Sequence, residues 1–167
     1  MADNDMPPPP EPQEQHRWLQ QLVGEWTYVV EAPTAPGAEP HKHEGVERVR
    51  AIGEIWIQGE SNADIPSLGP ATMQVTLGYD TQKKRFVGTW LGSMMNYLWL
   101  YDGELDALGK TLTLNAEGPS MAGDGGMAKY HDIITIVSLN ERTLRSEQLQ
   151  ADGTWKHFMT ATYKRKT

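Results

Sequence analysis

Residues 71–104 read ATMQVTLGYDTQKKRFVGTWLGSMMNYLWLYDGE. Bulky apolar side chains alternate with polar or small ones on both sides of Asp80–Lys84, a segment whose composition is typical of a tight turn. Alternation with a period of two predicts β-strands, and a turn this short joins neighbouring strands that run antiparallel. The stretch therefore predicts consecutive strands of one antiparallel sheet.

The same period continues over most of the chain from Trp26 onward. We expect about ten strands, joined by Asp- and Gly-rich turns and by a few longer connections rich in Pro and Gly. The predicted ranges are 25–32, 43–51, 54–61, 71–79, 85–92, 94–104, 110–117, 128–138, 143–150 and 154–164. Because no βαβ rhythm interrupts them, the predicted fold class is all-β, an antiparallel up-and-down β-barrel that is closed or nearly closed.

The beginning of the chain has a different composition. Residues 1–11 are acidic and rich in proline, with too little apolar surface to offset the entropy of ordering, and predict a disordered tail. The segment Glu11–Val23 carries large apolar side chains at helical spacing, among them Trp18 and Leu22. It predicts one short amphipathic helix packed across an end of the barrel. Residues 12–167 are expected to form a single barrel domain.

The composition excludes several classes of function. The 167 residues include no cysteine, which excludes disulfides, thiolate nucleophiles and zinc–thiolate sites. The net charge is −7 and no basic stripe is present, so we expect no binding to nucleic acid. The sequence contains neither a signal-peptide pattern nor an apolar window long enough to span a bilayer, and we expect a cytoplasmic protein without a membrane partner.

Several blocks resemble, in the same order, a bacterial family known as domain of unknown function 1579. They are HRWL at 16–19, LVGEW at 22–26, TLGYD at 76–80, RFVGTW at 85–90, GSMM at 92–95 and DGTW at 152–155. The resemblance covers Glu14 to Arg165 and implies a lipocalin-like (calycin) or fatty-acid-binding-protein-like barrel, with nitrobindin-like haem proteins as distant relatives. It implies no activity. Gly24-Glu25-Trp26 is similar to the start of the first lipocalin strand, whose Trp closes the barrel floor.

The segment Gly92–Tyr101 is bulky on both faces of a predicted strand and includes a methionine pair. Its outer face is expected to pack under the N-terminal helix or against a second subunit, or one of its faces lines an aromatic pocket. Flexible methionines beside aromatic rings favour an adaptable apolar pocket, with core packing as the alternative. The predicted ligand-binding residues are Phe86, Trp90, Met95, Tyr97, Trp99, His131 and His157.

His157 is a candidate for haem binding. If it shares an inward face with Met159, its imidazole is suited to be an axial haem ligand. If Phe158 points inward instead, His157 faces solvent. The other alternative is an imidazole that is hydrogen-bonded to a neighbouring strand.

Other polar residues are candidates for catalysis or metal binding. His131 and Asp132 are adjacent in a strand and point to opposite faces, so each needs a partner on another strand. A buried carboxylate with a shifted pKa is typical of a functional site. His41, His43 and Glu47 are residue types that bind metals. Because the two histidines follow a Pro-rich loop, we interpret them as exposed and predict no metal site.

The sequence therefore predicts a barrel that binds a small hydrophobic or amphipathic ligand in its interior. One alternative is an enzyme of the isomerase, cyclase or hydrolase type in the same pocket. Haem binding through His157 is another. The last alternative is a barrel filled by its own side chains that acts through oligomerisation, for example as a homodimer. The sequence identifies no catalytic residue and no cofactor.

Overall fold

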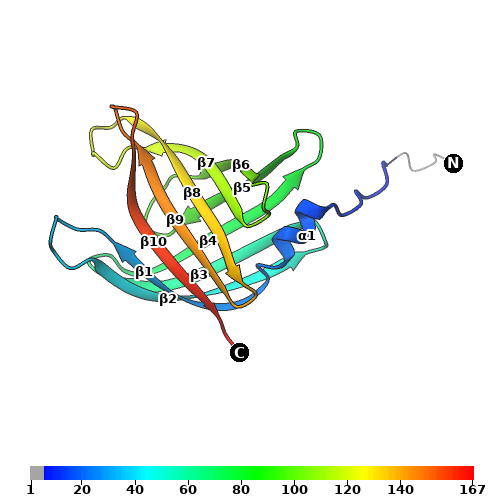
Figure 1. Ribbon diagram of the computed structural model, residues 1–167, viewed down its shortest axis with the longest axis horizontal. Coiled ribbons are helices and arrows are strands. Elements are labelled where there is room, and N and C mark those ends of the chain that lie inside the picture. Colours follow the sequence, from blue (N-terminus) through cyan, green and yellow to red (C-terminus); the bar gives the residue numbers. More distant parts are fainter. Residues whose placement is uncertain (1–5) are drawn as a thin grey trace.

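The computed structural model describes residues 6–167 and contains a closed antiparallel barrel with one short helix (Figure 1). Strands that follow each other in sequence pair with each other, and β1 closes the barrel against β10. The elements are α1 (Glu14–Gln20), β1 (Gly24–Ala32), β2 (His41–Ile52), β3 (Trp56–Ile65), β4 (Gly69–Asp80), β5 (Arg85–Gly92), β6 (Trp99–Leu105), β7 (Thr111–Pro119), β8 (Met127–Ser138), β9 (Glu141–Leu149) and β10 (Trp155–Arg165). This confirms the predicted all-β barrel of ten strands.

The barrel has two different ends. At the helix end, Trp18 of α1 donates from Nε1 to the carbonyl of Gly109 at 2.8 Å, and Gln20 reaches the carbonyl of Glu54 at 3.4 Å. At the other end, which we call the mouth, lie the connections 33–40, 66–68, 93–98, 120–126 and 150–154. Figure 1 places α1 away from the long connections of the mouth. Within residues 6–167, no helix is both long enough and apolar enough to cross a bilayer.

The helix end is closed by tightly packed side chains. Trp26 is 1% exposed, donates from Nε1 to the carbonyl of Leu22, and lies between the guanidinium groups of Arg142 and Arg165, 4.7 and 4.2 Å from its ring centroid. Arg165 also donates to the carbonyls of Gln21 and Val23, and so fixes the chain between α1 and β1. These contacts bury a large apolar area and stabilise a solid floor.

Several predicted boundaries differ from the structure by a few residues, and the helix and the sixth strand show why. The helix is shorter than the predicted Glu11–Val23, because the chain after Gln20 continues in tighter turns, with the amides of Leu22 and Val23 bonded three residues back. The sixth strand begins at Trp99 rather than at residue 94, and Ser93 is bonded to Thr72 of β4. The predicted tail lies partly outside the described residues, and its residues 6–10 are exposed.

Candidate functional site

The mouth half of the barrel interior contains a set of aromatic rings that we call the aromatic wall. Its members are Trp90 of β5, Trp99 of β6, Tyr130 of β8 and Phe158 of β10. Trp90 and Trp99 are cross-strand partners. The ring of Trp99 meets that of Tyr130 edge to face at 5.0 Å, and Tyr130 meets Phe158 in the same way at 6.1 Å. Edge-to-face contacts fix the orientation of each ring, so the wall is a continuous apolar surface.

The side of the barrel opposite the wall carries small residues. Gly45, Ala63 and Ala71 are cross-strand partners on β2, β3 and β4, and form one row on the inner face. In a barrel of ten strands, β3 lies across the interior from β8, which bears Tyr130. The ring of Tyr28 covers Gly45, where an added Cβ would collide with it, so Ala63 and Ala71 are the small side chains of the row that face the wall.

On β4 and β5, the exposure of inward-facing side chains rises from the helix end toward the middle of the strand, and Ala71 and Gly92 nearest the mouth are buried again. On β4, Leu77 is 1% exposed, whereas Val75 and Met73 are half-buried. The same change occurs on β5 between Phe86, which is 2% exposed, and the half-buried Trp90. Side chains that point inward and still keep accessible area line a space that other side chains do not fill. On these two strands the interior is therefore filled at the helix end and less tightly filled around Met73, Val75 and Trp90.

Methionines gather in the mouth half. They are Met73, Met94, Met95, Met121, Met127 and Met159, so of the eight in the sequence only Met1 and Met6 lie elsewhere, both before α1. The sulfur of Met95 accepts the indole N–H of Trp99 at 3.2 Å. Met121 and Met127 are exposed. Methionine side chains adapt their shape to what they contact, so this arrangement suits a surface that accommodates a ligand.

A polar cluster lies next to the aromatic wall. The hydroxyl of Tyr101 donates to Asp132, and Ser146 donates from Oγ to Oδ1 of Asp132 at 2.5 Å. Burial raises the pKa of Asp132, although both hydroxyls lower it, and burial likewise raises the pKa of Tyr101. The three residues offer a hydrogen-bonding group inside an apolar surround, which can act as an acid or a base when a substrate reaches it.

A second polar cluster lies deeper in the interior. Arg142 is ion-paired with Glu47, and Ser61 donates to the other oxygen of Glu47 at 2.8 Å. The guanidinium of Arg142 lies 3.8 Å from the ring centroid of Tyr163, and Nε of Arg142 is buried without a hydrogen-bond partner among the described residues. Burial, and secondarily the charge of Glu47, raises the pKa of Tyr28 to about 12. The pair brings no net charge into the barrel.

The sequence model of the family described as protein of unknown function (DUF1579) matches residues 11–165. The chain belongs to this family. No curated protein matches the chain.

Two solved structures share the barrel fold of this DUF1579 chain. Rv2717c from M. tuberculosis is 11% identical, with a TM-score of 0.65 over 94% of this chain and 100% of that one. The S-type phycobiliprotein lyase CPES from Guillardia theta is 13% identical, with a TM-score of 0.60 over 93% of this chain and 99% of that one. At these identities the likeness concerns the barrel fold alone.

The structure of the DUF1579 chain brings four of the seven predicted site residues together. Trp90, Met95, Tyr97 and Trp99 meet at the mouth, where the rings of Tyr97 and Trp99 lie 5.1 Å apart. Phe86 lies in the helix half instead, with its ring 6.1 Å from Trp18 and 5.0 Å from Tyr79.

The two predicted histidines lie on the outer face. His131 bonds from Nδ1 to Glu147 at 3.0 Å and stacks on Trp155 at 3.6 Å. His157 is the cross-strand partner of Glu147 and bonds from Nε2 to Thr160 at 2.7 Å. An irregularity between His157 and Met159 changes the phase of β10, so that Phe158 reaches the aromatic wall. His157 therefore does not supply the inward imidazole on which the haem alternative was based.

Sequence reasoning missed other inward residues. His43 was interpreted as exposed, but it is half-buried and lies on the inward side of β2 with Glu47, and burial lowers its pKa. Among residues 6–167, no group of three His, Asp or Glu side chains is arranged to hold a metal ion. Asp132, which the sequence presents as a strand residue in need of a partner, lies in the interior, and Arg142 was missed as an interior residue. The only signal for them was that each is in phase with apolar neighbours, Ile134 and Leu144.

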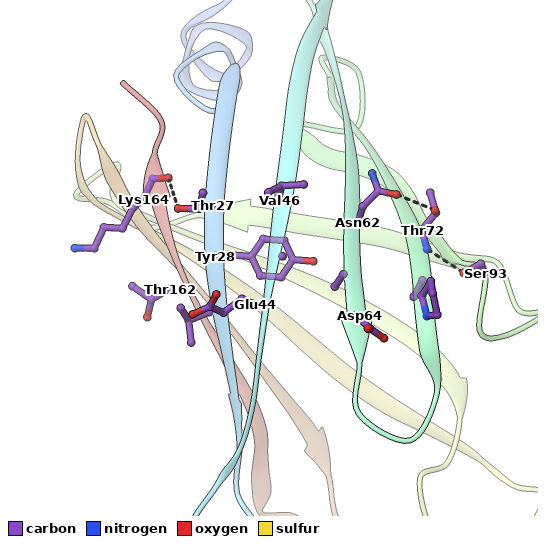
Figure 2. A pocket seen from close by; sticks show the side chains of 15 residues that line it. Thr27, Tyr28, Glu44, Val46, Asn62, Asp64, Thr72, Ser93, Thr162 and Lys164 are labelled. Atoms are coloured by element: carbon purple, nitrogen blue, oxygen red, sulfur yellow. Dashed lines mark hydrogen bonds between the residues drawn. The ribbon is translucent and has the colours of Figure 1, made fainter.

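A groove of about 930 Å³ crosses the outer face of β10 and β1 to β4 (Figure 2). Val29 and Val46 contribute to its apolar part, and Gly45, Ala63 and Ala71 of the inner-face row also border it. Three of its polar residues bond one another: Thr72 donates to Asn62 at 2.9 Å, and the amide of Thr72 donates to Ser93 at 3.0 Å. Because a ligand inside a barrel is covered on more sides than a ligand in a groove on the outer face, the interior is the better candidate for a ligand site.

Proposed function

We propose that the barrel binds a small, uncharged and mainly apolar ligand in the mouth half of its interior. The observation that carries the proposal is the change along the inner face, from the nearly inaccessible Leu77 and Phe86 to the half-buried Met73 and Trp90. Apolar surface that stays accessible inside a fold gains free energy when a ligand covers it, by about 25 cal/mol per Å².

The charges of the interior favour an uncharged ligand. Arg142 is already ion-paired with Glu47, so an anionic ligand would have to displace that carboxylate. Breaking a buried ion pair leaves an uncompensated charge, which costs about 3–5 kcal/mol. A neutral ligand avoids this cost.

A hydrogen-bonding group at one end of the ligand would find a partner. Tyr101 and Asp132 lie two residues along their strands from Trp99 and Tyr130, so the polar cluster is adjacent to the aromatic wall. An amphipathic ligand that stacks on the wall can direct a hydroxyl, carbonyl or amine toward Asp132 and Ser146. Such polar contacts fix the orientation of a ligand that is held mainly by apolar area.

The proposal is tested with N-phenyl-1-naphthylamine, a neutral dye whose fluorescence rises in apolar sites. We expect saturable binding by the wild-type protein. Ala63→Trp fills the space opposite the aromatic wall and is expected to raise the dissociation constant by about tenfold or more. The matched control, Ala107→Trp, makes the same change at an exposed position at the helix end and is expected to bind like the wild type. Equal binding by the wild type and Ala63→Trp would contradict the proposal.

The polar cluster supports a second candidate, acid–base catalysis in the same pocket. A carboxyl whose pKa is raised by burial, bonded to a tyrosine hydroxyl, is suited to exchange a proton with a neutral substrate. If a substrate is identified, Asp132→Asn should lower kcat by about a hundredfold while the dissociation constant of the dye stays close to that of the wild type. An unchanged kcat would exclude this role for Asp132.

A further inference from the structure

The ladder between β6 and β7 is incomplete toward the mouth, and we call this unpaired stretch of the wall the lateral opening. The two strands pair only over Asp102–Leu105 and Leu112–Asn115. Both strands are longer than this, since β6 pairs with β5 from Trp99 onward and β7 pairs with β8 up to Pro119. Toward the mouth, the main chains of β6 and β7 therefore run beside each other without the hydrogen-bonded pairing of a ladder.

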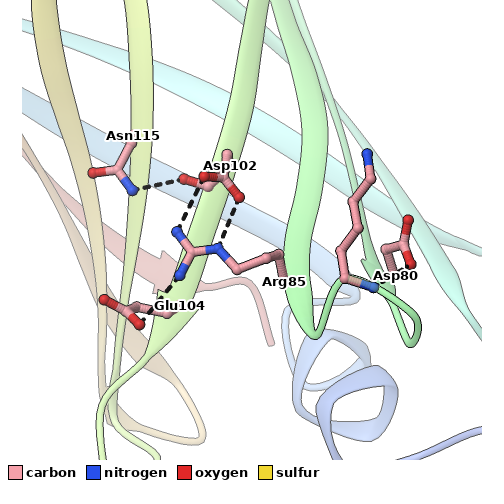
Figure 3. Close-up of polar contacts among 6 residues, drawn as sticks. Asp80, Arg85, Asp102, Glu104 and Asn115 are labelled. Atoms are coloured by element: carbon pink, nitrogen blue, oxygen red, sulfur yellow. Dashed lines mark hydrogen bonds and ion pairs between the residues drawn. The ribbon is translucent and has the colours of Figure 1, made fainter.

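The separation begins at a well-defined point. At the last pair, Asn115 donates from its side chain to the carbonyl of Asp102 at 2.8 Å, and Arg85 binds both carboxylate oxygens of Asp102 (Figure 3). Arg85 also reaches Glu104 at 3.2 Å. These bonds hold β5, β6 and β7 together up to Asp102. Continuing the same register would place Trp99 opposite Gly118 and Leu100 opposite Glu117, where no pairing occurs.

Side chains, not main-chain hydrogen bonds, close the opening. The hydroxyl of Tyr97 donates to the carbonyl of Glu117 at 2.9 Å. The indole of Trp99 covers Gly118, where an added Cβ would collide with the ring. Tyr97 belongs to the connection between β5 and β6, outside the ladder. Side chains change rotamer far faster than a ladder of main-chain hydrogen bonds opens, so this is the part of the wall that opens most easily.

The surface outside the opening is apolar on the β5–β6 side, whereas β7 contributes the exposed Glu117. Leu98 and Leu100 are 51% and 64% exposed, and Leu91 on the neighbouring strand is also exposed. On the inside, Trp99 belongs to the aromatic wall and contacts Tyr130. An apolar molecule that passes Tyr97 and Trp99 therefore moves from one apolar surface to another.

We propose that the ligand enters and leaves the barrel through this lateral opening, with Tyr97 and Trp99 as the gate. The inference rests on the proposed function, since it concerns access to the same interior site. It adds a route through the wall, beside the connection 93–98 and away from the other connections of the mouth. It also assigns to the exposed Leu98 and Leu100 the role of a first contact for an apolar ligand.

Because the chain contains no cysteine, the opening can be closed by a cross-link. Leu100→Cys with Glu117→Cys places one thiol on each side of the opening, to be joined by a short bis-maleimide. The matched control, Thr113→Cys with Ile133→Cys, joins two cross-strand partners where the β7–β8 ladder is complete. Rates of N-phenyl-1-naphthylamine binding and release are then measured by stopped-flow fluorescence, before and after cross-linking.

We expect the cross-link across the opening to slow both rates by about tenfold or more, with the dissociation constant changed by less than about threefold and the control unaffected. Tyr97→Phe, which removes the bond to Glu117, should accelerate both rates. Unchanged rates in the cross-linked protein, with binding retained, would overturn the lateral route and leave the proposed function intact. No binding by the wild type would overturn both.

Discussion

Trp99 lies over Gly118, across the lateral opening, so closely that a Cβ at Gly118 would collide with its indole ring. The contact joins two strands that share no main-chain pairing at this level. Trp99 can therefore adopt this position only because residue 118 is a glycine without a methyl side chain. This relationship connects the aromatic wall with the closure of the barrel.

Gly118→Ala should displace Trp99 from its position in the wall. We expect a loss of about 1–3 kcal/mol in the free energy of unfolding, because the added methyl overpacks the contact, together with faster exchange of the dye. Urea unfolding and stopped-flow fluorescence measure the two effects. Gly126→Ala, in the connection between β7 and β8, meets only the side chain of Asp124 and is the control. Stability and exchange rates equal to those of the wild type would contradict the role given to this contact.

The buried pair of Arg142 and Glu47 should be sensitive to the loss of either partner. Arg142→Met leaves the carboxylate of Glu47 buried without its cation, and we expect a loss of about 3–5 kcal/mol in the free energy of unfolding. Adding Glu47→Met should restore much of this loss, because no charge then remains. A double variant no more stable than Arg142→Met alone would show that the pair acts through something other than its charge. Urea unfolding of the single and double variants measures the difference.

The raised pKa of Asp132 predicts a specific pH dependence of stability. Its pKa in the folded protein lies above the ordinary value of 3.8, so the folded state binds more protons than the unfolded state between the two values. This contribution to stability is complete below 3.8 and is lost as the pH rises through the folded-state pKa. Asp132→Asn cannot ionise and should lack the loss, so its stability relative to the wild type rises with pH. If the difference between the two proteins does not vary with pH, burial does not raise this pKa.

The helix end should contribute to stability without affecting the ligand. Trp18→Phe removes the hydrogen bond to the carbonyl of Gly109 and is expected to cost about 1–3 kcal/mol, since it leaves a partly buried acceptor unpaired. Because the interior is filled between α1 and the mouth half, the dissociation constant of the dye should stay within about twofold of the wild type. Thermal unfolding and dye titration test the two parts separately. A large loss of binding would place the site at the wrong end of the barrel.

The sequence predicts the barrel well because each strand alternates inward and outward side chains, and this alternation is local. Residues 94–98 show its limit: they are as apolar as a strand, but the structure gives them no partner strand, so they form a connection. The phase of β10 at His157 depends on an irregularity that no residue type marks. The cluster of Tyr101, Asp132 and Ser146 joins β6, β8 and β9, and such contacts depend on register across several strands.

A crystal structure of the wild-type protein with bound N-phenyl-1-naphthylamine tests the interior site most directly. We expect the dye to lie inside the barrel, with one face on Trp99 and the other toward Ala63. A dye bound in the outer groove between Thr27 and Thr72 (Figure 2), with the interior between Trp99 and Ala63 closed by protein side chains, would contradict this expectation.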